Sequence, residues 1–133
     1  MGAWGYNSFE NDDAHDWLAD LVDGKVITPI EDALDAVLDD QDDYLEVDVS
    51  NSAIAASEIV AALSGRASKS VPKPVVDWIR SKPKPKASLR NKARRALVRI
   101  LGDNSELKDL WNESPDFAKW KASVKNLEKR LGS

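Results

Sequence analysis

The hydrophobic residues of this chain recur mainly at helical spacing. After residue 11, apolar positions follow one another at intervals of three and four residues, which places them on one face of a helix. The members of this first stripe are Ala14, Trp17, Leu18 and Leu21. Asn11 is a suitable N-cap for the helix, and Gly24 is expected to end it.

The second predicted helix has the clearest start in the chain. Thr28, Pro29 and Glu31 provide a capping hydroxyl, a proline at the first helical position and the glutamate of a capping box. Its buried face is expected to comprise Ile30, Ala33, Leu34, Val37 and Leu38. The acidic run over residues 39–43 should end this helix.

The next segment is expected to change from an extended to a helical conformation. Residues 44–49 alternate between polar and apolar side chains, which predicts a short extended piece. Ser50 or Asn51 is then the expected N-cap of a third helix, and Gly65 is expected to follow its last turn.

Prolines divide the basic stretch that follows. Pro74 is expected to begin a short helix over residues 75–80, and Pro83 and Pro85 impose an extended link. A long basic helix should then run over residues 88–101. Its core side is expected to comprise Leu89, Ala93, Ala96, Leu97 and Ile100.

Two more helices complete the pattern. Asn104 or Ser105 is expected to cap a short helix that includes Trp111, and the sequence Ser114-Pro115-Asp116 is expected to begin the last one. The apolar stripe of this last helix comprises Phe117, Trp120, Val124, Leu127 and Leu131. The sequence therefore predicts an all-α fold, with residues 1–133 forming a single compact domain of six or seven short helices.

The formal net charge of −4 conceals a strong separation of charge along the 133 residues. Residues 1–65 contain sixteen acidic residues and one basic residue, so their net charge is −15. Residues 66–101, a proline-rich connector and helix, have twelve basic residues and one acidic residue, whereas residues 102–133 are neutral. Such asymmetry indicates either a charged partner or pairing of the two faces within the molecule.

The opening residues combine glycine with three aromatic side chains. We expect Trp4, Tyr6 and Phe9 to fold back over the first helix at Trp17, because aromatic residues at this spacing usually bury area. Gly5 is expected to provide a tight backbone turn. The alternative is an exposed aromatic patch that binds a ligand or a partner.

The same opening resembles the signature of a protein family. The matching residues are Gly2, Trp4, Gly5, Phe9, Asn11, Asp12, Ala14, Asp16 and Trp17. On this pattern the chain resembles an uncharacterised bacterial family, domain of unknown function 4259, over most of its length. The resemblance implies a small bacterial protein and brings no assigned activity or site residues.

The acidic part of the chain favours binding to another protein, without catalysis, as the function. An acidic surface is suited to covering a basic surface on a partner, as in inhibitors and immunity-type proteins, because complementary charge accelerates encounter and gives selectivity. The expected contact residues are Asp35, Asp39, Asp40, Asp42, Asp43 and Glu46.

The basic segment over residues 82–99 supports an alternative function, the binding of a nucleic acid or another polyanion. Lysine and arginine side chains on one strip contact phosphates. The expected residues are Lys84, Lys86, Arg90, Arg94, Arg95 and Arg99. The acidic part of the chain would repel such a ligand at close range.

A third hypothesis is a carboxylate-metal hydrolase that uses Asp12, Asp13 and Asp16. His15 is the single histidine and the chain has no cysteine, which excludes histidine-rich and thiolate metal sites. The sequence has neither a nucleophile motif nor a phosphate loop. We therefore expect no bound metal, no cofactor and no enzymatic activity.

The sequence also indicates where the protein functions. The lack of cysteine suits the cytosol, and no apolar run approaches the length of a membrane span. A signal peptide has a positively charged start, whereas the first twenty residues of this chain contain no lysine or arginine. We therefore expect a cytoplasmic protein without membrane contact.

Overall fold

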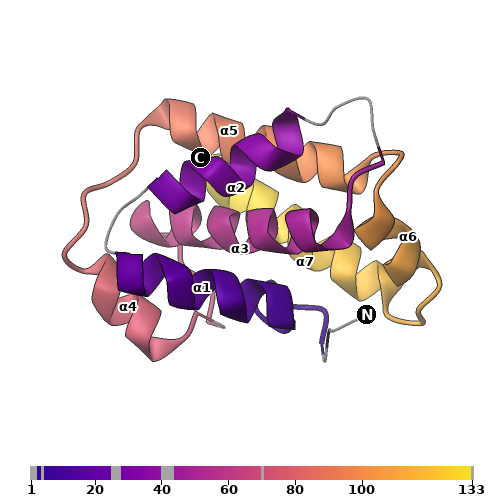
Figure 1. Ribbon diagram of the computed structural model, residues 1–133, viewed down its shortest axis with the longest axis horizontal. Coiled ribbons are helices and arrows are strands. Elements are labelled where there is room, and N and C mark those ends of the chain that lie inside the picture. Colours follow the sequence, from indigo (N-terminus) through magenta and orange to yellow (C-terminus); the bar gives the residue numbers. More distant parts are fainter. Residues whose placement is uncertain (1–2, 4, 25–27, 40–43, 70, 133) are drawn as a thin grey trace.

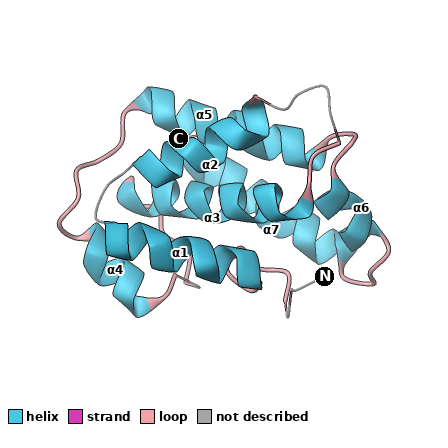
Figure 2. Cartoon of the chain, viewed as in Figure 1, coloured by secondary structure: helices cyan, strands magenta, loops and turns pink. Residues whose placement is uncertain are grey.

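The structure, a computed structural model, describes residues 3, 5–24, 28–39, 44–69 and 71–132. These residues form seven helices joined by loops, with no strand among them (Figure 2). The helices are α1 (Asp12–Gly24), α2 (Thr28–Leu38), α3 (Val47–Leu63), α4 (Lys73–Ile79), α5 (Ala87–Leu101), α6 (Glu106–Asn112) and α7 (Phe117–Leu131). The all-α prediction is confirmed. None of the described helices has both the length and the apolar character needed to cross a membrane.

Helix α3 lies at the centre of the fold, with α1 and α4 along one side, α2 and α5 along the other, and α7 behind it in the view of Figure 1. Every side chain from Ala53 to Leu63 is buried. A helix that is apolar nearly all round is typical of a core position. Alanines at Ala55, Ala56 and Ala61 let neighbouring helices approach closely, so α1, α2, α5, α6 and α7 all contact α3.

The start of α3 differs from the prediction. The helix begins at Val47 with Glu46 at its N-cap, so the expected extended piece is limited to the residues around Leu45, and Ser50 and Asn51 are buried inside the helix. The backbone N–H of Val47 donates to a carboxylate oxygen of Glu106 at 2.8 Å. A side chain from α6 therefore satisfies this helix terminus, and no local pattern around residue 47 indicates that contact.

Most other helix ends agree with the prediction to within two residues. Asn11 accepts a hydrogen bond from the N–H of Ala14 at 2.8 Å, and Ser105 accepts one from Lys108 at 3.4 Å. Gly65 has a φ of 85°, the left-handed conformation expected after a helix end. The predicted cap at Thr28 involves a side chain outside the described part of the chain.

The last helix starts later than expected. Helix α7 begins at Phe117, with Asp116 at its N-cap. Ser114 does not cap the helix directly, because its hydroxyl accepts a hydrogen bond from the N–H of Asp116 at 3.1 Å and so forms a turn before the helix. The expected stripe nevertheless faces the core, and Trp120 stacks on Trp111 with ring centroids 6.3 Å apart.

The N-terminal segment packs only partly as expected. Phe9 is buried as predicted, but Tyr6 lines a small cavity together with Trp111 and Trp120. Trp17 lies in a different place, between α1, α2 and α3. Trp4 lies outside the described residues. Gly5 does not have a positive φ. A Cβ at this position would collide with the carboxylate of Glu10, so glycine provides space there.

Candidate functional site

The acidic residues expected to form a binding surface differ in their contacts and exposure. Asp35 on α2 forms an ion pair with Lys92 on α5, with 2.9 Å between Lys92 Nζ and Asp35 Oδ1. The hydrogen bond to Asp35 raises the pKa of Lys92 above its ordinary value. Asp39 and Glu46 are exposed, whereas Asp40, Asp42 and Asp43 lie outside the described residues. The acidic and basic parts of the chain therefore meet at Asp35.

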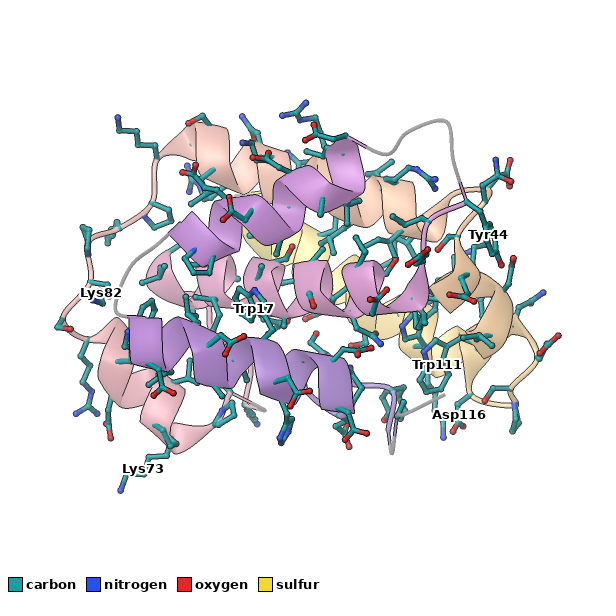
Figure 3. All side chains as sticks on the ribbon, in the orientation of Figure 1. Trp17, Tyr44, Lys73, Lys82, Trp111 and Asp116 are labelled. Carbon is teal, nitrogen blue, oxygen red and sulfur yellow. The ribbon has the colours of Figure 1, made fainter. Side chains whose placement is uncertain are left out.

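A tyrosine beside this region has a strongly shifted pKa. The side chain of Tyr44 is labelled in Figure 3, and its hydroxyl donates to Asp109 Oδ2 at 2.6 Å. This bond to a carboxylate, with smaller contributions from desolvation and from the negative charge of Asp109, raises the pKa of Tyr44 to about 12. Folding thus favours the protonated phenol. The stability that this hydrogen bond contributes is fully present below pH 10 and is lost as pH rises through about 12.

A phenolate absorbance titration should therefore show a tyrosine pKa of about 12, and Asp109→Asn should move that pKa back toward 10 because the charge is removed. Tyr44→Phe is the control, because it removes this phenol and should abolish the transition near pH 12. The absence of a transition near pH 12 in the unmodified protein would contradict the hydrogen bond to Asp109.

The most distinctive feature of the surface is a groove of about 600 Å³ between α1 and α2, over the first two turns of α3. Helices α1 and α2 lie on either side of α3 in the view of Figure 1, and both pack mainly on α3 and little on each other. The side chain of Trp17 lines this groove (Figure 3). We call this feature the acidic groove. Its carboxylates are Asp13, Asp16, Asp20, Asp32 and Asp48, and its other lining residues are Trp17, Pro29, Ala33, Ala36, Val49 and Ser52.

Each helix contributes one face to the acidic groove. On α1, the residues at positions 13, 16 and 20 share a face, because they are three and four residues apart. On α2, Pro29, Ala33 and Ala36 have the same spacing and form an apolar surface beside Asp32. No lysine or arginine is among the lining residues in the described chain. The groove therefore has three carboxylates on its α1 side, one on its α2 side and one from α3, beside an apolar surface.

The carboxylates of the acidic groove are spread along it and do not converge on one point. Asp13 accepts a hydrogen bond from the side-chain amide of Asn51 at 3.0 Å, which holds it at the end of the groove. Asp12 and Asp16 are exposed on α1, as is His15. Within the described parts of the chain, no three histidine, cysteine or acidic side chains are close enough together to hold a metal ion. The arrangement suits several separate positive charges better than one cation.

The basic residues of the alternative hypothesis differ in how exposed they are. Lys84 and Lys86 are exposed on the link between α4 and α5, and Arg94 and Arg95 are exposed further along α5. Arg90 is half-buried. Arg99 donates to the backbone carbonyls of Asp103 and Asn104 at 2.8 and 3.3 Å, so its guanidinium holds the turn after α5.

Three carboxylates of the acidic groove were not identified from the sequence: Asp20, Asp32 and Asp48. The spacing of Asp13, Asp16 and Asp20 is a usable signal, because it indicates one exposed face of the first helix. The contributions of Asp32 and Asp48 depend on how α2 and α3 pack. The spacing within a single helix contains no information on that packing.

The fold and the groove together define a small all-α protein with an acidic, partly apolar groove on its surface. A protein-family model described as "Domain of unknown function (DUF4259)" matches residues 2–123, so the chain belongs to this family. The resemblance noted in the sequence is thereby confirmed. Searches among curated proteins and among solved structures gave no match. The family description assigns no activity, and a function has to be inferred from the residues of the groove.

Proposed function

We propose that this protein acts by binding, without catalysis, and that the acidic groove holds a basic amphipathic helix of a partner protein. The observation that supports this is the combination of five carboxylates with the apolar side chains of Trp17, Ala33 and Val49 in one groove. An amphipathic helix that lies in a groove between helices is a recurrent mode of recognition. The apolar face of the partner helix would contact these apolar side chains, and its lysines and arginines would contact the carboxylates.

The dimensions of the groove fit this occupant. Asp13 and Asp20 are seven residues apart on α1, which corresponds to about 10 Å along the helix axis, or two turns of a partner helix. Ala33 and Ala36 have small side chains, so another helix can approach α2 closely. Basic side chains at positions i, i+3 or i+4, and i+7 of the partner would then lie opposite the carboxylates.

The charge of the surrounding chain supports the same proposal. Residues 1–65 have a net charge of −15, which attracts a basic partner over a longer range than the contacts themselves. Complementary charge of this kind accelerates association and suppresses wrong partners. The biological consequence that we propose is the masking of a basic surface on the partner, as an inhibitor or immunity-type protein does.

The proposal can be tested with a synthetic helical peptide that has a leucine seam flanked by lysines. Isothermal titration calorimetry should show binding with a Kd below about 100 μM at low ionic strength. The affinity should fall at least about tenfold in high salt, because the ion pairs are at the rim of an open groove.

A matched peptide with the same leucine seam and glutamate in place of lysine provides the control. It should not bind, because its charges would lie against those of the groove. Equal binding of both peptides would show that the interaction is only hydrophobic, and the absence of binding by the lysine peptide at low salt would contradict the proposal.

A further inference from the structure

A second groove, of about 650 Å³, lies on another face of the molecule, between α5, α7 and the loop after α3. Helix α7 contacts α3, α5 and α6, whereas the acidic groove is formed by α1, α2 and the first turns of α3. The two grooves are therefore separate. We call the second one the basic groove. Within the described residues, the lining cations that form no ion pair are Arg66, Arg94, Lys125 and Lys129.

These four side chains come from three different elements and converge on one groove. None of them is in an ion pair in the described chain, and Glu128 is the only carboxylate among the lining residues there. Like charges that converge in this way repel one another and destabilise the folded state. An anionic ligand would remove that repulsion.

Arg130 also borders the basic groove, but its guanidinium has a different role. It donates to both carboxylate oxygens of Glu58, to Asn126 Oδ1 at 2.8 Å and to the backbone carbonyl of Arg66 at 3.1 Å. Its donors are thus used within the protein. The bond to the Arg66 carbonyl fixes the loop after α3 at the edge of the groove, and the Arg66 side chain remains available for a ligand.

The positions of the other cations are also defined by the fold. Arg94 packs against Gly132, where an added Cβ would be 3.3 Å from the guanidinium carbon, so the end of α7 leaves space for this side chain. Lys125 and Lys129 are four residues apart on α7, which corresponds to about 6 Å along the helix. The basic groove therefore presents a row of positive charges on a defined scaffold.

We propose that the basic groove binds the sugar–phosphate backbone of duplex nucleic acid, independently of the base sequence. The lining residues include no apolar and no aromatic side chain. A protein partner would require an apolar anchor at the centre of the interface, and a single strand would require aromatic side chains for base stacking. Phosphates require only cations and polar groups, which is what the groove provides.

The residues involved differ from those expected from the sequence. Only Arg94 belongs to the basic segment over residues 82–99, and Lys125 and Lys129 lie in the neutral C-terminal part of the chain, beyond the residues that the family model matches. The neutrality of that part conceals a face of α7 on which basic side chains predominate. This site is also independent of the proposed function, because it shares no residue with the acidic groove.

The test is fluorescence anisotropy with two labelled duplexes of equal length and unrelated sequence. Both should bind with the same affinity at low salt, and a plot of log K against log salt should have a slope of about −3 to −4 for four phosphate contacts. Lys125→Gln/Lys129→Gln should reduce the slope by about two and the affinity at least about tenfold. The control Lys108→Gln/Lys121→Gln removes the same charge outside the groove and should leave both values unchanged.

Three results would overturn the inference. The first is no binding of either duplex at about 20 mM salt, where phosphate contacts are strongest. The second is an equal loss of affinity in the groove variant and in the control. The third is salt-sensitive self-association, measured by light scattering, that Lys125→Gln/Lys129→Gln abolishes while no duplex binds. In that case the basic groove would hold the acidic part of a second copy of the chain. Asp16→Lys, in the acidic groove, should not weaken duplex binding, and this separates the present inference from the proposed function.

Discussion

Replacement of Arg130 by alanine is expected to destabilise the protein by about 3–5 kcal/mol, because it leaves the buried carboxylate of Glu58 without its counter-charge. The side chain of Glu58 is 2% exposed and that of Arg130 is 19% exposed. The pair joins the middle of α3 to the last turn of α7, and Arg130 also holds the loop at Arg66. Urea denaturation gives the free energy of unfolding directly.

Two further variants distinguish an uncompensated buried charge from a general loss of contacts. Lys129→Ala removes an exposed neighbour and should change the free energy of unfolding by less than about 0.5 kcal/mol. Glu58→Met combined with Arg130→Met removes both charges and should recover most of the stability lost in Arg130→Ala. A double variant that is less stable than Arg130→Ala would contradict this account of the ion pair.

Reversal of charge in the acidic groove is expected to have the largest effect on binding. Asp16→Lys combined with Asp32→Lys reverses a charge on each side of the groove. The affinity for the lysine peptide should fall at least about 100-fold, since like charges placed against each other across an interface cost several kcal/mol. Both side chains are exposed, so the melting temperature should remain close to that of the unmodified protein.

The matched control is Asp103→Lys combined with Glu113→Lys. Both residues are exposed and lie outside the acidic groove, and the change in net charge is the same. The affinity should then fall by no more than a few-fold, which reflects only the weaker long-range attraction. An equal loss of affinity in the two variants would mean that net charge alone, and not the groove, determines binding.

The sequence predicts those parts of the fold whose determinants are local. Helix α1 begins where Asn11 caps it, and α5 buries the expected stripe that ends at Ile100. The sequence does not predict the start of α3, because the terminus at Val47 is satisfied by Glu106, a residue 59 positions away. It also misplaces Tyr6, whose neighbours Trp111 and Trp120 belong to distant helices.

The difference between local and long-range determinants also explains which parts of the two grooves the sequence predicts. The separation of charge along the chain is visible in the sequence, and it correctly indicates that acidic side chains dominate one region. Their placement along one groove depends on the way α1 and α2 both pack on α3 and little on each other. Likewise, Arg94 joins Lys125 and Lys129 only because α5 lies beside α7. Arrangements of this kind follow from tertiary packing, which periodicity within one helix does not define.

The most direct test of the central claim is a nitrogen–proton NMR correlation spectrum of the protein during titration with the lysine peptide. The indole resonance of Trp17, identified by its absence in Trp17→Phe, should shift together with the backbone amides of Asp16, Ala33 and Val49, since these residues line the acidic groove. The indoles of the buried Trp111 and Trp120 should not move. Shifts confined to α5 and α7, or to the region of Asp39 and Tyr44, with Trp17 unchanged, would contradict the claim that the acidic groove is the binding site.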